Sequence, residues 1–253
     1  MNNRLHDTPR LLLAKVRNGD YAHPGDEEAI DLLLARAMNY CVLTQSSKIL
    51  DAGCGLGGTA QYVKNKTNAE VSGVDIDSVA IAHAKTTYAG IKFFTGDILN
   101  SQQVFSDQQF QLLYMFNVLY SIEDKVACLK NLAKNATPHA VLAIFDYTQT
   151  VSTDLSMTDL AGKTMYPLSL SDLKVIFDAA GWELVEILDL RDNYLKWYEQ
   201  FLQKIVAMKE KELLNEFSQA TYQRVFDTFS NLLQNLRDNT LSGALIIGKK
   251  KLA

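Results

Sequence analysis

The stretch Lys48-Ile-Leu-Asp-Ala-Gly-Cys-Gly-Leu-Gly-Gly-Thr59 decides the fold of this 253-residue chain. An apolar run ends in Asp51 and is followed by glycines and a helix-compatible segment, which predicts a strand, a tight turn and a helix. Glycines at such a turn adopt positive φ angles and let a ligand approach the backbone, and the helix N-terminus offers unpaired N–H groups. The stretch is therefore a candidate nucleotide-binding element.

Two nucleotide ligands compete for this element. Gly53, Gly55 and Gly58 satisfy the G-x-G-x-x-G fingerprint of dinucleotide-binding folds, and Asp75, which ends the next apolar run, has the spacing of a ribose-binding acid. Asp51 favours a different ligand, because a carboxylate before the turn repels a pyrophosphate but suits an ammonium or sulfonium group. S-adenosylmethionine (SAM) presents such a group. The remaining alternative is a close packing corner that binds nothing.

Composition bounds the class of protein. A chain of 253 residues, 47% of them hydrophobic, can fill one α/β domain with insertions. The net charge of −4 gives no basic footprint for nucleic acid. The three cysteines form no CxxC pair and the four histidines are scattered, so we expect neither a disulfide framework nor a metal site. With no apolar run long enough for a membrane span and no apolar leader, we expect a cytoplasmic protein without a membrane partner.

Apolar strands alternate with helices five times between residues 48 and 146. Such alternation predicts βαβ units with right-handed crossovers, and hence a mostly parallel sheet with helices on both faces. Ligands of these sheets bind at the carboxyl ends of the strands. Polar residues occupy all five of these ends here, and they are Asp51, Asp75, Asp97, Asn117 and Asp146.

Two flanking segments are expected to cover the sheet. Residues 1–45 are predicted as an N-terminal helical cap with turns around Tyr21. Residues 191–240 are predicted as a helical insertion before the last strand, and aromatic residues recur at helical spacing from 193 to 237. These helices form either a lid over an apolar pocket or an ordinary packed pair. We expect residues 1–253 to be a single domain.

Three motifs, in order, resemble those of class I SAM-dependent methyltransferases, and the similarity extends over about residues 20–250. Residues 51–58 resemble the first motif, Gly73-Val-Asp75-Ile76 the second and Gly96-Asp97-Ile98 the third. The resemblance implies an α/β, doubly wound, seven-stranded Rossmann-like sheet that is mostly parallel, with an antiparallel last strand and helical lid insertions. It also implies SAM as cofactor and S-adenosylhomocysteine as product, with Asp75 on the ribose and Asp97 near the adenine. The implied cofactor contacts are Asp51, Gly53, Gly55, Gly57, Asp75, Ile76, Asp97 and Ile98.

Within that family, the chain is most similar to small-molecule N-methyltransferases of the phosphoethanolamine and sarcosine/dimethylglycine type. The similar segments are Gly19-Asp-Tyr21, Leu56-Gly-Gly58, Asp146-Tyr147, and Tyr166 before a Leu-Ser-Leu-Ser-Asp run. This similarity implies transfer of a methyl group to a small metabolite that carries an amine.

The acceptor side of the site is predicted from aromatic and polar residues. Methyl transfer requires donor and acceptor in near-attack geometry, and aromatic rings stabilise substituted ammonium ions. Asn117 is a candidate for both the acceptor and the methionine end of the cofactor. His23 is a candidate base or lid residue, although a histidine in such a turn is expected to be exposed. The predicted catalytic residues are Tyr21, Tyr147 and Asn117, and the predicted acceptor-binding residues are Tyr21, His23, Tyr147, Tyr166 and Arg191, the last for an anionic group.

One departure from the family keeps other functions open. Phosphoethanolamine enzymes carry an Asp and, four residues later, a catalytic His after the fourth strand, whereas this chain has Asn117 and Ser121 at the matching positions. The alternatives are an O- or C-methyltransferase of a biosynthetic pathway and a SAM-binding protein without transferase activity. A nicotinamide-dependent oxidoreductase is disfavoured by Asp51 and by the Gly96-Asp97 turn.

Overall fold

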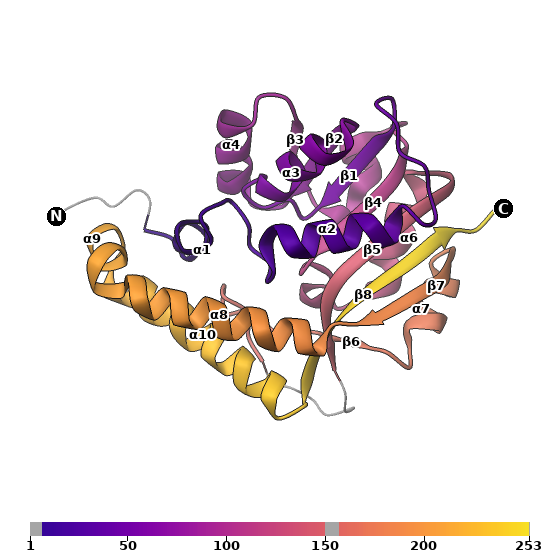
Figure 1. The fold of residues 1–253 in the computed structure, drawn as a ribbon. Helices are drawn as coiled ribbons and strands as arrows, with labels where there is room; N and C mark the ends of the chain where they lie inside the picture. Colours follow the sequence, from indigo (N-terminus) through magenta and orange to yellow (C-terminus); the bar gives the residue numbers. More distant parts are fainter. Residues whose placement is uncertain (1–6, 150–156, 253) are drawn as a thin grey trace.

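The computed structural model describes residues 7–149 and 157–252 and places a central sheet between two layers of helices (Figure 1). The main path of the sheet has the strand order β3-β2-β1-β4-β5-β8-β7, and the short β6 pairs with β5 beside this path. Neighbours from β3 to β5 are parallel, whereas β8 runs antiparallel to β5 and β7. The strands are β1 Lys48–Ala52, β2 Glu70–Asp75, β3 Lys92–Thr95, β4 Phe110–Phe116, β5 Ala136–Gln149, β6 Leu168–Ser169, β7 Trp182–Asp189 and β8 Leu241–Lys250.

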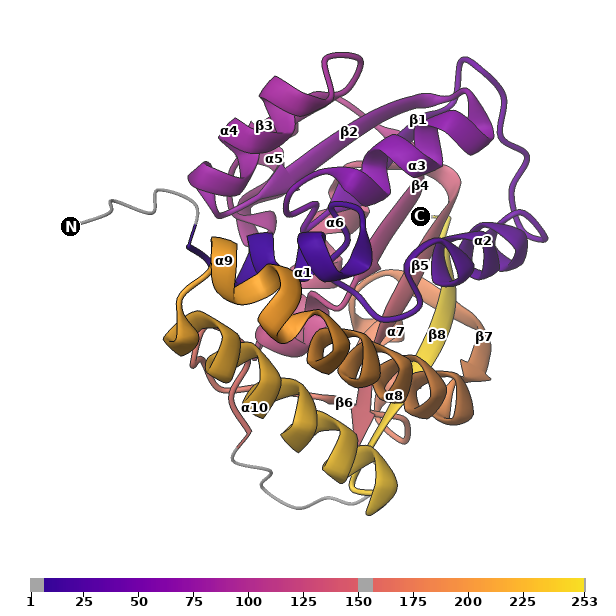
Figure 2. The ribbon, with the colours of Figure 1, turned by 60° about the vertical axis from the view of Figure 1, so that its left-hand side comes forward.

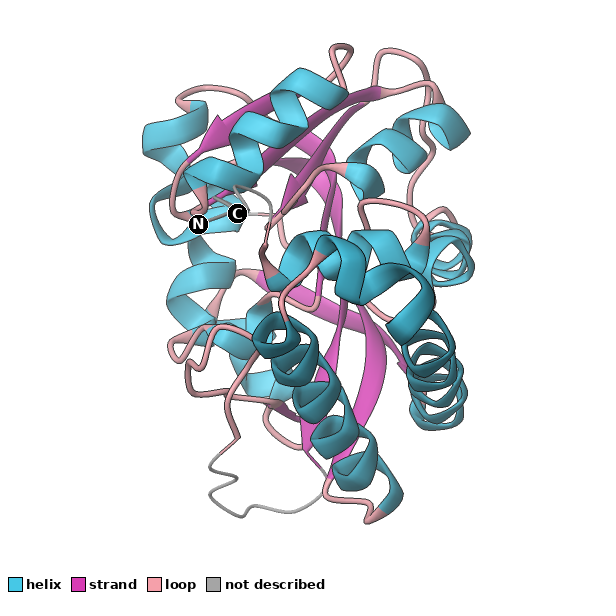
Figure 3. Cartoon of the chain, turned by 90° about the vertical axis from the view of Figure 1, so that its left-hand side faces the viewer, coloured by secondary structure: helices cyan, strands magenta, loops and turns pink. Residues whose placement is uncertain are grey.

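Helices cover both faces of this sheet, as Figure 3 shows. In β1, Ile49 belongs to one buried cluster and Leu50 to the other, because side chains alternate along a strand. Asp51 therefore points to the same side as Ile49, which is the side covered by α1, α2, α3, α8 and α10. The helices are α1 Pro9–Arg17, α2 Asp26–Ala37, α3 Gly58–Thr67, α4 Ser78–Thr87, α5 Ser101–Phe105, α6 Lys125–Lys134, α7 Leu173–Ala179, α8 Arg191–Met208, α9 Leu214–Glu216 and α10 Gln219–Arg237.

The N-terminal segment contains a helix, α1, whose bounds the sequence did not indicate. The Thr8 side chain accepts a hydrogen bond from the Leu11 N–H, and Pro9 occupies the first turn, where a missing N–H costs nothing. Asn18 ends the helix in a left-handed conformation with φ 55°. α1 packs against α8 and α10, so the N-terminal helix meets the helices that precede the last strand (Figure 2).

The aromatic stretch before the last strand forms two long helices that lie side by side (Figures 1 and 2). After α8 the chain makes one π-helical turn, Lys209–Leu213, and the short α9. Phe217 is extended, and Ser218 then caps α10 by accepting a hydrogen bond from the Thr221 N–H. The helical spacing from 193 to 237 is therefore divided at residues 209–218, and most aromatic residues of the two helices are buried.

The predicted topology agrees with the observed one, including the parallel sheet with helices on both faces and the antiparallel last strand. The fifth strand is longer than its apolar run suggested, because β5 pairs with β4, β6 and β8 along its length. None of the helices in residues 7–149 and 157–252 combines the length and apolarity that a membrane crossing needs.

Candidate active site

The glycine loop joins β1 to α3 at the carboxyl edge of the sheet. The N–H groups of Gly53 and Cys54 both donate to the Val74 carbonyl, at 2.8 and 3.0 Å, which ties the loop to the end of β2. Gly53, Gly55 and Gly57 have φ angles of 93°, 51° and 92°, which residues other than glycine rarely adopt. A Cβ on Gly55 would have no neighbour within 4 Å, so the loop leaves open space on that side.

Asp75 lies directly against this loop. Its Oδ2 accepts a hydrogen bond from the Gly55 N–H at 2.9 Å, and its Oδ1 accepts one from the Asp77 N–H at 2.9 Å. Arg10 of α1 lies near both acids, with Nη1 at 3.9 Å from Asp75 Oδ1 and 3.3 Å from Asp77 Oδ2. The predicted ribose acid and the glycine loop are thus held together, and α1 places a cation beside them.

The third motif lies at the same edge. The Gly96 N–H donates to the Asp75 carbonyl at 3.0 Å, which joins the ends of β2 and β3. The Asp97 side chain accepts a hydrogen bond from the Leu99 N–H at 2.9 Å and so caps the short turn that begins at Ile98. Ile98 is buried, whereas Ile76 is 68% exposed. An apolar side chain left open beside two acids is suited to cover the flat face of a purine.

Asp51 is a buried acid with an unsatisfied oxygen. The residue is 2% exposed, and its Oδ2 has no hydrogen-bond partner among the described residues. Burial raises the pKa of Asp51 to about 8, although the neighbouring Tyr114 hydroxyl opposes the rise, and the negative charge of Asp75 adds to it. An unpaired buried acceptor is costly, so a donor or cation that reaches it is stabilised.

Asn117 supplies a second unsatisfied oxygen at the end of β4. Its φ angle is 50°, and its Nδ2 donates to the Tyr194 hydroxyl at 3.4 Å. Its Oδ1 is buried without a partner among the described residues. SAM carries an ammonium and a sulfonium group, so the open glycine loop and the two unpartnered oxygens of Asp51 and Asn117 fit it.

The segment between α1 and α2 lies on top of the glycine loop. A Cβ on Gly58 would come within 2.7 Å of the Asp20 carbonyl oxygen, so this contact requires glycine. The Asp20 carboxylate accepts a hydrogen bond from Tyr88 at 2.8 Å and pairs with His83 Nε2 at 2.8 Å. These contacts fasten the N-terminal segment to both α3 and α4.

His23 is buried in this segment, and the expectation of an exposed histidine is wrong. The residue is 2% exposed and its ring stacks on Phe116 at 4.1 Å between centroids. Its Nε2 lies 3.0 Å from Thr59 Oγ1, and its Nδ1 lies 3.2 Å from the Pro24 carbonyl oxygen. Burial lowers the pKa of His23 to about 3, so the ring is neutral at neutral pH, with the proton on Nδ1 facing the carbonyl.

A cluster of tyrosines lies beside Asn117, which bonds to one of them, Tyr194. Tyr147 and Tyr198 share a hydrogen bond between their hydroxyls, and the rings of Tyr194 and Tyr120 lie 5.7 and 5.2 Å from that of Tyr147. The Tyr166 N–H donates to the Tyr120 carbonyl at 2.6 Å. Burial raises the pKa of each of Tyr120, Tyr147, Tyr194 and Tyr198, so these phenols stay neutral.

Two predicted acceptor residues stand apart from this cluster. Tyr21 is half-buried, and its hydroxyl donates to Glu27 at 3.1 Å. Arg191 opens α8, where its N–H donates to Asp189 at 3.0 Å and its Nη2 donates to the Leu236 carbonyl of α10 at 3.0 Å. Asn117 and Tyr147 therefore meet through Tyr194, and Tyr147 and Tyr166 meet through Tyr120, while Arg191 connects α8 to α10.

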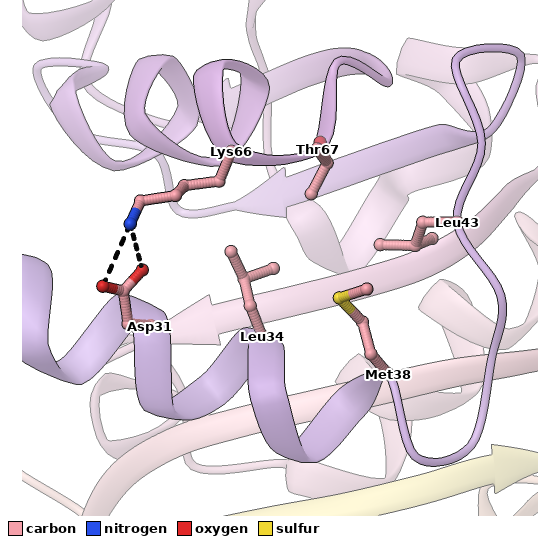
Figure 4. A pocket seen from close by; sticks show the side chains of 6 residues that line it. All are labelled: Asp31, Leu34, Met38, Leu43, Lys66 and Thr67. Atoms are coloured by element: carbon pink, nitrogen blue, oxygen red, sulfur yellow. Dashed lines mark hydrogen bonds and ion pairs between the residues drawn. The ribbon is translucent and has the colours of Figure 1, made fainter.

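Two surface cavities lie outside these groups. One, of about 250 Å³, opens between α2 and α3, where Lys66 pairs with Asp31 (Figure 4). The other, of about 570 Å³, lies between α1 and the α9 region and reaches Asp20 and His83. Neither cavity is lined by Asp51, Asp75 or Asn117.

Several residues of the site carried no recognisable signal in the sequence. Tyr194 and Tyr198 follow the helical spacing of α8, which indicates burial but not the hydroxyl contacts to Asn117 and Tyr147. Asp20 and His83 are 63 positions apart. No local pattern connects Asp20 to α4.

Comparison with known proteins identifies the family. Residues 21–187 match a family model described as a methyltransferase domain. The chain is 26% identical over 245 residues to the phosphoethanolamine N-methyltransferase of Plasmodium falciparum (isolate 3D7), covering 92% of this chain and 88% of that protein. It is also 26% identical over 221 residues to phosphoethanolamine N-methyltransferase 3 of Arabidopsis thaliana, covering 82% of this chain but 43% of that protein. The chain thus spans less than half the length of this plant relative.

A solved structure has the same fold over nearly the whole chain. Phosphoethanolamine N-methyltransferase 2 of Haemonchus contortus, in complex with phosphomonomethylethanolamine and S-adenosylhomocysteine, superposes with a TM-score of 0.82 at 18% identity, over 99% of this chain and 59% of that one. A Galdieria sulphuraria protein assigned as a sarcosine dimethylglycine methyltransferase gives 0.76 at 16% identity, over 89% and 86%. The predicted fold is confirmed. Since the matched model spans well over half of the sequence and includes all three motifs, the family predicted from them is also confirmed, and the chain belongs to the methyltransferase domain family.

Proposed function

We propose that this chain is a SAM-dependent methyltransferase that transfers a methyl group to a small metabolite carrying an amine. The observation that carries the proposal is the buried carboxylate of Asp51, which has an unpartnered oxygen among the described residues and lies at the strand end before the glycine loop. A buried acid at such a place favours a ligand with a positive charge. SAM supplies an activated methyl group on a positively charged sulfur. The phosphoethanolamine N-methyltransferases among the relatives support an amine as the acceptor.

The proposed cofactor residues come from the loops at the carboxyl edge of the sheet. The backbone of the glycine loop holds the methionine part, with Asn117 Oδ1 accepting from its ammonium. Asp75 accepts from the ribose hydroxyls with the lone pairs that Gly55 and Asp77 leave free. The adenine lies against apolar side chains, and Asp97 accepts a hydrogen bond from its amino group. The full set is Asp51, Gly53, Gly55, Gly57, Asp75, Ile76, Asp97, Ile98 and Asn117.

The proposed acceptor residues are the neutral aromatic side chains next to Asn117. We propose that Tyr147 and Tyr166 turn their rings to the acceptor, because rings attract the substituted ammonium that forms on transfer. Tyr21 stands apart from these rings, and its proposed role is to exclude water from the side of the N-terminal segment. His23 is kept neutral and bonded to Thr59, so we assign it to holding this segment on α3 rather than to proton abstraction. We likewise assign Arg191 to joining α8 and α10.

The chain contributes mainly position and exclusion of water. In a displacement of this type, holding the two reactants in near-attack geometry supplies much of the acceleration. The Asn117 and Ser121 pair, which replaces an Asp and a His, is therefore compatible with transfer. The acceptor amine needs its lone pair free, and exclusion of water from the site disfavours its charged form.

Transfer of isotope from methyl-labelled SAM to a panel of amines, phenols and carboxylates tests the proposal. We expect label on one or more small amines and none on phenols or carboxylates. Glycine-loop variant Gly53→Val is the control, because a Cβ on Gly53 would come within 2.3 Å of Val118 and close the loop. Label that appears only on oxygen or carbon acceptors supports the alternative of an O- or C-methyltransferase. Firm SAM binding without transfer to any acceptor supports a SAM-binding protein without transferase activity.

A further inference from the structure

Two buried side chains of opposite charge lie on either side of the loop that follows β4. Lys125 is the first residue of α6 and is 9% exposed, and Asp146 lies in β5 and is 0% exposed. Charged side chains are almost never buried to this extent unless they are paired or fully hydrogen-bonded. Their hydrogen-bond partners therefore indicate which part of the structure the two charged groups stabilise.

Asp146 accepts hydrogen bonds from N–H groups of the loop. Its Oδ2 accepts hydrogen bonds from the N–H groups of Val118 and Tyr120, at 3.1 and 3.2 Å. Its Oδ1 accepts one from the N–H of Tyr147, at 2.7 Å. Three backbone donors therefore converge on one carboxylate, and two of them belong to the loop after Asn117.

Lys125 donates hydrogen bonds to carbonyl groups of the same loop. Its Nζ donates to the carbonyl oxygen of Leu119 at 2.7 Å and to that of Ile122. It also donates to the carbonyl of Tyr166 at 2.6 Å, and it lies 5.7 Å from the centroid of the Tyr166 ring. All three donors of the ammonium are used, and each partner is a backbone oxygen.

The loop is thus fixed from both sides by charge-assisted hydrogen bonds, which are stronger than those between neutral groups. The loop begins at Asn117, whose left-handed conformation turns its amide toward Tyr194. The Lys125 bond to Tyr166 adds the segment before β6, which the Tyr166 N–H also joins to the Tyr120 carbonyl. One ammonium group therefore connects the loop after β4 to Tyr166. None of these bonds reaches the glycine loop or Asp75.

We propose that Lys125, together with Asp146, is the positioning residue for the acceptor side of the site. The pair sets the place of Tyr120 and Tyr166, and none of its hydrogen bonds reaches a residue assigned to the cofactor. This proposal rests on the proposed function for its effect on catalysis. Its structural part, the ordering of residues 117–122 and 163–168, stands on the hydrogen bonds alone.

Lys125→Met tests the proposal, because methionine fills the stem of the side chain and removes all three donors. Lys130→Met is the matched control on the exposed face of α6. Losing hydrogen bonds from a charged donor is expected to lower acceptor kcat/KM by about 10- to 100-fold. The dissociation constant for S-adenosylhomocysteine is expected to stay within about threefold, because no hydrogen bond of Lys125 goes to a residue assigned to the cofactor.

Hydrogen–deuterium exchange gives a readout that does not depend on turnover. In Lys125→Met, we expect amides of residues 117–122 and 163–168 to exchange at least about tenfold faster, with residues 53–60 unchanged. Asp146→Asn is the second variant, used if Lys125→Met does not fold, and it is expected to speed exchange in residues 118–120. Unchanged exchange in these segments, or an equal loss of cofactor affinity and acceptor turnover, overturns the proposal. If the wild-type protein methylates no acceptor, the proposed function fails, and the exchange measurement still decides whether Lys125 orders the loop.

Discussion

The Asp75 carboxylate accepts a hydrogen bond from the Gly55 N–H at 2.9 Å, so the acid that ends β2 closes the glycine loop that follows β1. Its other oxygen accepts from the Asp77 N–H, and the Asp75 carbonyl accepts from Gly96 at the end of β3. Three strand ends are therefore joined through one residue. A cofactor bound at this edge meets a preformed site, which lowers the entropic cost of binding.

Cofactor binding is expected to be coupled to the ionisation of Asp51. Burial raises the pKa of Asp51 to about 8, so the side chain is mostly protonated at pH 7 without ligand. The positive charge of SAM favours the ionised form, whereas S-adenosylhomocysteine lacks the charge on sulfur. The ratio of SAM to S-adenosylhomocysteine affinity should therefore rise between pH 6 and pH 8. Calorimetry in buffers of different ionisation enthalpy measures the proton released, and equal proton release for both ligands contradicts the role of Asp51.

The same carboxylate predicts how the stability of the ligand-free protein depends on pH. The pKa of Asp51 is raised on folding, so its contribution to stability is fully present below about pH 4, the unfolded value, and is lost as pH rises through about 8. Asp51→Asn cannot ionise, and it should therefore lose less stability than wild type between pH 6 and pH 9. Denaturant unfolding at both pH values measures this difference. Parallel losses in the two proteins exclude an ionisable Asp51 with a raised pKa.

The Asp20 carboxylate is expected to slow release of the cofactor. It holds the N-terminal segment on α4 through His83 and Tyr88, and the same segment contacts Gly58 at the start of α3. Asp20→Asn removes the charge from both contacts, and we expect S-adenosylhomocysteine to dissociate about tenfold faster, as for loss of charged hydrogen bonds. Stopped-flow displacement measures the rate. Asp107→Asn, an exposed acid far along the chain, is the control, and equal rates in the two variants would show that the segment does not retain the cofactor.

Substitutions at Tyr147 separate its ring from its hydroxyl. Tyr147→Phe keeps the ring and leaves the Tyr198 hydroxyl without its partner, so we expect a loss of stability of about 1–3 kcal/mol and a modest loss of activity. Tyr147→Leu also removes the ring face, and we expect the KM for the amine to rise by a further factor of about five to thirty, as for loss of a desolvated cation–π contact. Thermal unfolding and steady-state kinetics measure the two effects. Equal KM values in both variants argue against a ring that holds the amine.

The meeting of the proposed cofactor residues at one edge of the sheet was predictable because they follow the strands in order along the chain. Gly53, Asp75 and Asp97 each come directly after an apolar strand, and parallel strands bring such ends to one edge. The acceptor side was only partly predictable. Tyr147 meets Tyr198 across 51 positions, and Lys125 meets Tyr166 across 41. Helical spacing in α8 indicates that Tyr198 is buried, but contacts between distant segments depend on how the helices pack. The burial of His23 was missed for the same reason, since Phe116 and Thr59 enclose it from other elements.

The central claim is that the loop between β1 and α3, closed by Asp75, binds SAM. Calorimetric titration of the wild-type protein and of Asp75→Ala with SAM, and of the wild-type protein with NAD, tests this claim most directly. We predict that the wild-type protein binds SAM and not NAD, and that Asp75→Ala weakens SAM binding by about 1.5–3 kcal/mol, as for lost charged hydrogen bonds. Binding of NAD in place of SAM, or an SAM affinity that Asp75→Ala leaves unchanged, would contradict it.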